Sequence, residues 1–407
     1  MPKHLSARAL VRTRRPEFPV YCLRHHAVDT ASRWFQQHFP GRVLFAVKTN
    51  PLFVQTLAKS GLRHFDVASI AEIEEVAANV PNARMSFMHP VKNRDAIRRA
   101  YFDFGVRDFA LDSEEELKKI LDETNCAKDL NLFVRIAVNN RHSRMSLSGK
   151  FGISGREARR LLFKVRQVGR GLGVCFHAGS QIMHPRAYVE AMKRVAKCIR
   201  RSGVIIDYLD IGGGFPSAYP HLAPPPMQLF IDAIIESFNE MPVSETCELW
   251  CEPGRALVAE GASLVVKVEH RKGNLLYIND GVFGGLFDAG QPGFIYPVRS
   301  LSEKESAGRE LTEFSFFGPT CDSMDFMQGP FLLPIDVSEG DYIEIGSLGA
   351  YSLQLRTQFN GFNYSETVEV SDGPLLSMYG LVESSKMDAV TATSPELVPI
   401  ELSGETY

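Results

Sequence analysis

The sequence has few cysteines, no long apolar run and little net charge. Its seven cysteines are scattered without a Cys-x-x-Cys pair, and only Cys247 and Cys251 lie close together. No histidine or cysteine group completes a metal site around them, so we expect no metal and a reducing, cytoplasmic setting. No apolar run approaches the roughly 18 residues that cross a bilayer, and a net charge of −3 gives no reason to expect nucleic acid as a partner.

The two ends of the chain differ in character. The first fifteen residues hold five basic side chains and no acid, and no apolar segment follows that would complete a secretory signal. We expect a short, solvated and poorly ordered terminus there, with a transit peptide as the alternative. The tail from about Ser384 is polar, and we expect it to be loosely held.

Strand-like and helical segments alternate between residues 40 and 255. Amphipathic stretches separate most of the apolar runs, and two of these stretches open with capping boxes, Ser69 with Glu72 and Ser113 with Glu116. The eight apolar runs are residues 42–47, 64–68, 84–88, 108–112, 130–138, 171–177, 205–211 and 247–253. This alternation predicts a (β/α)8 barrel of the TIM type, with a doubly wound open sheet as the alternative.

The sequence pattern changes after Arg255. Segments such as "ASLVVKVEH", "NLLYIND", "TEFSFFG" and "DYIEIG" are β-rich and joined by turn signals, without long helical patterns between them. They predict a C-terminal antiparallel β domain, which the strand-like "FPVYCLR" near the N-terminus can join. We place the barrel at residues 24–262 and the β domain at residues 1–23 and 263–407.

Reactive groups of a TIM-type barrel gather at the C-terminal ends of its strands. Lys48, Asp66, His177 and Glu252 all follow such strand ends. Alone, Lys48 is most simply a strand-end lysine that reaches water, and the sharper alternative is a Schiff-base amine. Alone, His177 is a satisfied core histidine. Glu252 is harder to dismiss, because a carboxylate ending an apolar strand needs a cation, such as a protonated ring nitrogen.

Gly212-Gly213-Gly214 follows the seventh strand and Arg255 the eighth. The glycines expose three consecutive backbone amides, and Arg255 can add a bidentate charge, which together suit a phosphate. The alternative is a tight turn beside a surface arginine. A Schiff-base lysine, a phosphate cradle, a ring neighbour and a carboxylate for a ring nitrogen are what pyridoxal phosphate requires, so we expect this cofactor.

Seven segments carry a resemblance to a known family. "FAVKTNP", "FDVAS", "FHAGSQ", "DIGGGFP", "CEPGR", "GPTCDSMD" and "EIGSLGAYS" together resemble the fold-III pyridoxal-phosphate decarboxylases of basic amino acids, in the expected order. The chain looks most like bacterial ornithine and lysine/ornithine decarboxylases. The resemblance implies an alanine-racemase-like fold of barrel plus β domain. It also implies a head-to-tail homodimer with two shared sites, and formation of putrescine or cadaverine for polyamine biosynthesis.

The resemblance also implies roles for individual residues. Lys48 would form the aldimine with the cofactor, His177 would stack on its ring, and Glu252 would bind its pyridine nitrogen. The phosphate would be held by Ser180, Gly212, Gly213, Gly214, Arg255 and Tyr351. Asp66, Glu72 and Arg144 would lie around the cofactor, although the capping box with Ser69 already explains Glu72.

For the substrate, the resemblance implies a site completed by the second subunit. Cys321 of that subunit would protonate the Cα after carbon dioxide leaves the quinonoid, while Asp322 and Asp288 would receive the distal ammonium. The alternatives are an inert buried cysteine for Cys321 and a solvated loop pair for Asp322 and Asp325. Relatives often have tyrosine where this chain has Phe283, and loss of that hydroxyl can alter the preference for chain length.

Three other functions are alternatives, and a residue of this sequence argues against each. Diaminopimelate decarboxylase shares the fold but typically has glutamate after the loop cysteine, where this chain has aspartate in "CDSMD". Non-catalytic relatives that bind a regulatory protein tend to lose the lysine or the cysteine, and both remain. A fold-III racemase usually places arginine against the ring nitrogen, where this chain has Glu252. Decarboxylation of ornithine or lysine is therefore the predicted function.

Overall fold

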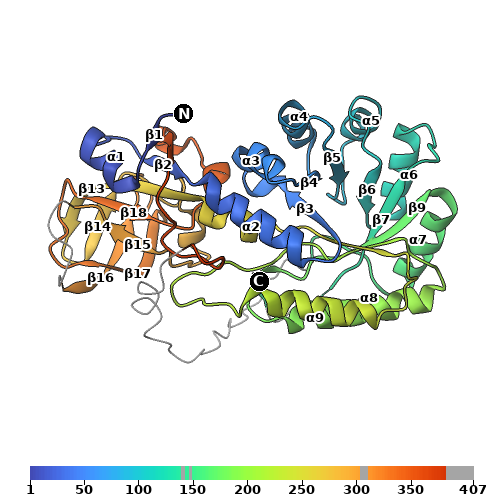
Figure 1. Cartoon of the computed structure of the whole chain (residues 1–407). Helices are drawn as coiled ribbons and strands as arrows, with labels where there is room; N and C mark the ends of the chain where they lie inside the picture. The colour runs from blue at the N-terminus through green and yellow to red at the C-terminus, as the bar shows by residue number, and fades with distance from the viewer. Residues whose placement is uncertain (139–142, 146–148, 303–309, 382–407) are drawn as a thin grey trace, which may run out of the picture.

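The computed structural model describes residues 1–138, 149–302 and 310–381, together with the backbone of residues 143–145. Figure 1 shows two bodies side by side, a barrel wrapped by helices and a domain built on a β-sheet. Within the described residues, none of the helices is both long and apolar enough to span a membrane.

Eight parallel strands form a closed barrel, as predicted. They are β3 (Arg42–Ala46), β4 (His64–Val67), β5 (Arg84–Phe87), β6 (Asp108–Leu111), β7 (Asn131–Arg135), β9 (Gly171–Cys175), β11 (Tyr208–Asp210) and β12 (Glu248–Cys251). The pairing of Cys251 in β12 with Val43 in β3 closes the ring, which excludes the open doubly wound sheet. Large side chains such as Phe133 and Trp250 fill the barrel interior, so functional groups have room only at its mouth.

Helices cover the outside of the barrel. They are α2 (His25–His38), α3 (Val54–Lys59), α4 (Ile70–Asn79), α5 (Arg94–Phe102), α6 (Glu114–Glu123), α7 (Gly155–Val168), α8 (Arg186–Ser202), α9 (Met227–Asn239) and the short α10 (Arg255–Val258). Both predicted N-caps form: Ser69 Oγ accepts the Glu72 N–H at 3.2 Å, and Ser113 Oγ accepts the Glu116 N–H at 3.1 Å. These caps fix where α4 and α6 begin.

The second domain is built on a nine-stranded sheet. Its strands are β1 (Lys3–His4), β2 (Val20–Leu23), β13 (Ala262–Lys272), β14 (Leu275–Ile278), β15 (Val298–Ser300), β16 (Leu311–Phe317), β17 (Phe326–Pro334), β18 (Tyr342–Ile345) and β19 (Glu366–Val370). The N-terminal β2 lies between β13 and β19, as predicted. The sheet is mixed, because β2 and β1 pair in parallel with β19 and β14 pairs in parallel with β16. Long connections make these parallel pairs possible, and the connection between β2 and β19 includes the whole barrel and strands β13 to β18.

The N-terminal segment differs from its prediction. Instead of a poorly ordered terminus, helix α1 (Ala7–Arg14) begins at an N-cap formed by Ser6 and buries Leu10 and Val11 against the sheet. Arg8 donates to the carbonyl oxygens of Ser300 and Ser302 at 3.2 and 2.9 Å. The basic residues of this segment therefore belong largely to an amphipathic helix rather than to a poorly ordered terminus. The polar tail from Ser384 lies outside the described residues.

The chain passes between the two bodies at two adjacent points. β2 ends at Leu23 before α2, and β13 begins at Ala262, while the Arg24 N–H donates to the Gly261 carbonyl oxygen at 2.8 Å. Arg24 is buried and pairs with Glu344 of β18 at 2.7 Å. On this basis we keep residues 24 and 262 as the proposed domain boundaries.

A two-stranded sheet and several single turns complete the fold. β8 (Ser143–Met145) pairs with β10 (Ser180–Ile182) beside the barrel mouth. The 3-10 turns are η1 (Val47–Thr49), η2 (Pro51–Phe53), η3 (Ala259–Gly261), η4 (Phe287–Ala289), η5 (Leu353–Leu355) and η6 (Phe359–Gly361).

Candidate active site

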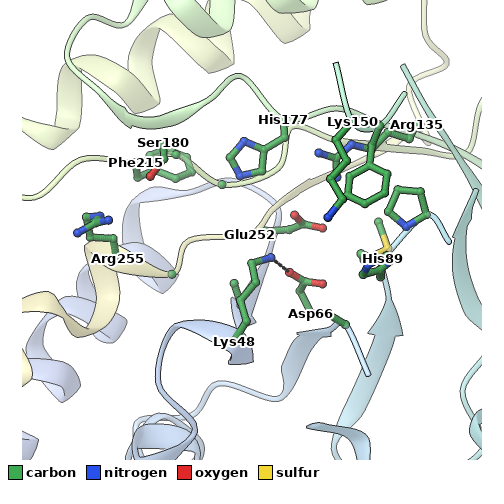
Figure 2. Close-up of a pocket in the computed structure, with 18 of the residues that line it drawn as sticks. Lys48, Asp66, His89, Arg135, Lys150, His177, Ser180, Phe215, Glu252 and Arg255 are labelled. Atoms are coloured by element: carbon green, nitrogen blue, oxygen red, sulfur yellow. Dashed lines mark hydrogen bonds and ion pairs between the residues drawn. The ribbon is translucent and has the colours of Figure 1, made fainter. Parts of the chain in front are cut away.

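A cavity of about 460 Å³ opens at the C-terminal end of the barrel strands (Figure 2). Most of the residues predicted to bind a cofactor line it: Lys48, Asp66, His177, Ser180, Gly213, Gly214, Glu252, Arg255 and Tyr351. Tyr351 comes from the second domain, so both bodies contribute to this one cavity.

Lys48 lies in the η1 turn directly after β3. Its Nζ atom is 3.1 Å from Asp66 Oδ2 and points into the cavity (Figure 2). Burial disfavours the charged amine, but the neighbouring Asp66 carboxylate outweighs this effect and raises the pKa of Lys48. The amine is thus held as a cation at rest, beside a carboxylate that can accept its proton when it must act as a nucleophile.

His177 follows β9 and lies above the Lys48 amine in Figure 2. Its Nδ1 accepts the Gly179 N–H at 3.2 Å, so the proton of the neutral ring is on Nε2. Burial, and then the charges of Arg135 and Lys48, hold the pKa of His177 well below its usual range. The result is a flat, neutral ring on the cavity wall, which suits stacking on another planar ring.

The glycine run forms a tight turn beside the cavity. Gly212 and Gly214 have positive φ angles of 70° and 100°, and a Cβ at Gly214 would lie 2.3 Å from the Gly179 carbonyl oxygen. A Cβ at Gly213 would lie 2.5 Å from the Glu252 carbonyl oxygen. Only glycine fits these positions, and the amides of Gly213 and Gly214 stay open to the cavity.

Arg255 is not the surface arginine of the alternative interpretation, because only 4% of it is exposed. Its two terminal nitrogens donate to the Tyr219 hydroxyl and to Asp288 Oδ2, each at 2.9 Å. Its Nε is buried without a hydrogen-bond partner among the described residues. An unmatched N–H on a buried cation is costly, and a phosphate oxygen would satisfy it.

Ser180 and Tyr351 lie at the same end of the cavity as Arg255. Figure 2 shows Ser180 on the Arg255 side of His177, and the Arg255 guanidinium lies 5.0 Å from the centre of the Tyr351 ring. Tyr351 has a positive φ of 51°, and its N–H donates to the Thr49 carbonyl oxygen at 3.2 Å. This bond attaches the second domain directly to the turn that carries Lys48.

Glu252 lies buried after β12, close to two other carboxyl groups. Burial, and then the charges of Asp210 and Asp66, raise the pKa of Glu252 well above its usual range, while Lys48 opposes this. Asp210 Oδ1 accepts the Gly212 N–H at 2.8 Å, and its Oδ2 is buried without a hydrogen-bond partner among the described residues. A protonated ring nitrogen placed against this negative cluster would relieve the repulsion that raises the pKa.

These features together fit pyridoxal phosphate. One end of the cavity supplies an unmatched cation and open amides for a phosphate. Its middle has a neutral flat ring and a lysine amine, and a carboxylate faces the place of a ring nitrogen. The predicted cofactor therefore matches the donor set of the cavity group by group.

Of the described residues predicted to bind the cofactor, Glu72 and Gly212 are not among those that line the cavity. Glu72 is half-buried, and its carboxylate accepts the N–H of Ala68, the residue before the Ser69 N-cap, at 2.7 Å, while its own N–H donates to Ser69 Oγ in the cap. Burial raises the pKa of Glu72, and the Ala68 N–H opposes that shift. The side chain of Arg144 lies outside the described residues, so the role predicted for it stays a prediction.

Several residues that line the cavity were not predicted from the sequence. They are Met88, His89, Pro90, Arg135, Lys150, Phe151 and Phe215. Figure 2 shows His89, Arg135 and Lys150 on the side of His177 away from Arg255. Arg135 is the last residue of β7, so the strand-end rule that found Lys48 and Asp66 could have found it.

Cys321 lies in the loop between β16 and β17, on the second domain. It is exposed, which contradicts the inert buried alternative, and it is not among the described residues that line the cavity. Its N–H donates to Asn360 Oδ1 at 3.1 Å. The half-buried Asp322 next to it accepts the Met324 N–H at 2.8 Å. Within one chain, Cys321 thus lies outside the cavity that Lys48 lines.

The remaining predicted substrate residues have partners within the chain. Asp288 is buried and paired with Arg255, which places it at the phosphate end of the cavity rather than beside Asp322. Phe283 is half-buried, and its ring centre lies 5.0 Å from that of Phe359. Asp325, for which a solvated position was considered, is only 1% exposed.

Comparison with known proteins agrees with this site. The family model for the pyridoxal-dependent decarboxylase pyridoxal-binding domain matches residues 25–259, and that for the C-terminal sheet domain of the same family matches residues 228–349. The chain is 31% identical to the lysine/ornithine decarboxylase of Selenomonas ruminantium over 363 residues, covering 85% of this chain and 88% of the relative.

Solved structures show the same likeness. The arginine decarboxylase of Paramecium bursaria Chlorella virus has a TM-score of 0.79 at 25% identity, covering 89% of this chain and 98% of that one. The lysine/ornithine decarboxylase of Vibrio vulnificus, solved with putrescine, has a TM-score of 0.75 at 28% identity, covering 90% and 99%.

Proposed function

The chain belongs to the pyridoxal-dependent decarboxylases, and we propose that it releases carbon dioxide from L-ornithine, L-lysine or both to give putrescine or cadaverine. The family and the cavity agree on a pyridoxal-phosphate-dependent decarboxylase. The choice of these two substrates, and a place in polyamine synthesis in the cytoplasm, are the proposal. Both substrates carry a distal ammonium, which a carboxylate such as Asp322 can receive.

Each cavity residue has a role that follows from its position. When bound, pyridoxal phosphate supplies an electron sink for the substrate Cα. Lys48 would hold the cofactor through its amine, with Asp66 accepting and returning the amine proton. Arg255 and the amides of Gly213 and Gly214 would bind the phosphate. Glu252 would keep a proton on the ring nitrogen.

One observation carries the proposal: the cavity holds the cofactor-binding groups, while the groups proposed to act on the substrate lie elsewhere on the chain. Cys321 is exposed and Asp322 is half-buried on a loop of the second domain, and neither lines the cavity of its own chain. A second copy that presents this loop to the cavity would complete the site. Cys321 of one protomer would then protonate the Cα of a substrate bound beside Lys48 of its partner.

The surface around Cys321 supports such a homodimer. Five large apolar or aromatic side chains near the loop and on the adjoining segment are exposed: Met324, Leu355, Phe359, Phe362 and Tyr364. A gathering of this kind marks an interaction surface more often than a solvated one. Because the dimer is built from identical copies, each interface would form two equivalent sites.

The proposal is tested by carbon dioxide release from the purified protein loaded with pyridoxal phosphate. L-ornithine, L-lysine, meso-diaminopimelate and L-arginine are offered in parallel, and Cys126→Ala, which replaces another exposed cysteine, serves as the matched control for Cys321→Ala. We expect release from ornithine or lysine, lowered by Cys321→Ala and unchanged by Cys126→Ala. Release only from diaminopimelate or arginine, or from none of the four, would overturn the substrate assignment.

A further inference from the structure

We propose that Asp325 is a positioning residue that sets the place of Cys321 and of Phe283 at the same time. This inference rests on the proposed function, in which the Cys321 loop completes a partner's site. Asp325 is four residues beyond Cys321 and is almost fully buried, although Cys321 is exposed and Asp322 is half-buried. A carboxylate buried beneath an exposed loop needs a reason to be there.

The Asp325 carboxylate joins two separate segments. Its Oδ2 accepts both the Thr320 N–H at 3.1 Å and the Thr320 hydroxyl at 2.7 Å, and Thr320 directly precedes Cys321. Its Oδ1 accepts the Val282 N–H at 2.7 Å, and Val282 directly precedes Phe283. One side chain therefore holds the residue before the proposed acid and the residue before the proposed chain-length determinant.

The backbone around this carboxylate is shaped to receive it. A Cβ at Gly281 would lie 2.1 Å from Asp325 Oδ1, and a Cβ at Gly318 would lie 2.2 Å from the same atom. Neither glycine has a positive φ angle, so both are required here by close approach to Asp325 rather than by backbone conformation. The two segments are packed onto the carboxylate from both sides.

The loop is also closed on itself around Cys321. The Gly318 N–H donates to the Asp325 carbonyl oxygen at 2.9 Å, and the Asp325 N–H donates to the Asp322 carbonyl oxygen at 3.1 Å. Asn360 binds the Cys321 N–H from the other side. Cys321 thus stands at the tip of a short loop whose two ends meet at Asp325.

The hydrogen-bond donors around this side chain explain why the position carries aspartate rather than asparagine. Among the described residues no cation forms an ion pair with Asp325, so its burial is offset by three donors, two of them backbone N–H groups that cannot turn away. Asparagine has the same shape but only one acceptor oxygen, and its amide NH₂ would face a donor. Asp325→Asn is therefore expected to release one of the two segments while removing no atom from the core.

The consequence for the reaction is specific. A thiol that must reach a carbon atom tolerates little displacement, and a shift of about 1 Å can lower a rate on the order of 10²-fold. If Cys321 is displaced, the substrate Cα loses its proton donor, and the proton would go instead to the cofactor carbon that is bonded to the substrate nitrogen. Water would then hydrolyse this product, leave the amino group on the cofactor and release the chain as an aldehyde, so a larger share of turnover would end in the aldehyde. If Phe283 moves with it, the ratio of ornithine to lysine turnover changes as well.

The test compares Asp325→Asn and Thr320→Val with the wild-type holoenzyme. Thr320→Ser, which keeps the hydroxyl, is the conservative rescue. Asp341→Asn is the control, because Asp341 also accepts the N–H and hydroxyl of one residue, Ser338, but on an exposed turn of the same domain. We expect both test variants to raise the aldehyde-to-diamine ratio and to change the ornithine-to-lysine ratio of kcat/KM. Loss of rate with both ratios unchanged would overturn the inference and leave Asp325 a stability residue.

Mixed dimers locate the defect. Asp325→Asn mixed with Lys48→Ala forms one site from intact Lys48 and an intact Cys321 loop, so activity should return. Asp325→Asn mixed with Cys321→Ala has no intact loop, and activity should stay low. The reversed pattern would overturn the inference. Failure of the reference mixture, Lys48→Ala with Cys321→Ala, would instead overturn the shared site on which the inference rests.

Discussion

The Lys48 amine and the Asp66 carboxylate meet at 3.1 Å across the mouth of the barrel, at the ends of the neighbouring strands β3 and β4. This contact places a cation where a cofactor aldehyde would react, with a proton acceptor beside it. The strand pairing sets the spacing of the two side chains, because Ala46 and Asp66 are partners in register. The geometry of the site is thus a property of the barrel itself.

Lys48→Ala is expected to abolish turnover and the visible absorbance of the bound cofactor, because Lys48 supplies the amine that is paired with Asp66. Activity and absorbance spectra of the loaded protein measure both effects. Lys59→Ala, at the exposed end of α3, is the control and should change neither. A Lys48→Ala protein with full activity would refute the assignment of this lysine.

Cys321→Ala is expected to slow turnover and to divert part of it to the aldehyde, because the proposed donor to the Cα is gone. When it is mixed with inactive Lys48→Ala, partial activity should return, since a mixed dimer contains one intact site. Carbon dioxide release and product analysis measure the two effects. Absence of rescue, with subunit exchange demonstrated by differently tagged copies, would contradict the shared site.

The sequence predicted the parts of the site that follow from strand order. Lys48, His177 and Glu252 follow barrel strands and Asp66 lies near the end of β4, and strand ends can be recognised from apolar runs alone. The same rule applies to Arg135 at the end of β7, but that apolar run continues to Val138 and concealed the strand end. The parallel pairs of the second sheet were not predictable, because long connections leave no local signal.

The burial and the long-range pairing of individual side chains could also not be predicted from the sequence. Nothing in "CDSMD" distinguishes the half-buried Asp322 from the buried Asp325, since the difference lies in the distant Val282 and in two glycines that approach Asp325. Asp288 was likewise assigned by resemblance to the substrate ammonium. Its buried pairing with Arg255 depends on how η4 packs against the barrel, which no local pattern encodes.

Asp288→Asn is expected to weaken pyridoxal phosphate binding about tenfold, which corresponds to about 1.4 kcal/mol, because Arg255 loses the anion that orients it. The ornithine-to-lysine ratio should not change, since the phosphate end of the cavity is not where the substrates differ. Fluorescence titration with the cofactor and paired kcat/KM values measure these effects. A changed ratio with unchanged cofactor affinity would instead return Asp288 to the distal ammonium.

His64 makes the free energy of unfolding depend on pH in the acid range. It begins β4 at the opposite end of the barrel from the cavity, where burial, then the charges of Arg42 and Arg84, lower its pKa to about 4 from a usual 6.5. Between these two values the unfolded chain binds a proton that the folded protein does not, so the free energy of unfolding decreases as the pH falls through this window. Above pH 6.5 the ring is neutral in both states and has no such effect.

His64→Gln removes this titration. Its free energy of unfolding should therefore fall less than that of the wild type between pH 6.5 and 4, because glutamine binds no proton in either state. Denaturant unfolding at several pH values across the window measures the difference, which should be largest at the acid end. His270→Gln, an exposed histidine of β13, is the matched control and should follow the wild-type curve. Parallel curves for His64→Gln and the wild type would show that the barrel accommodates the charged ring, so that the folded protein binds the proton as readily as the unfolded chain.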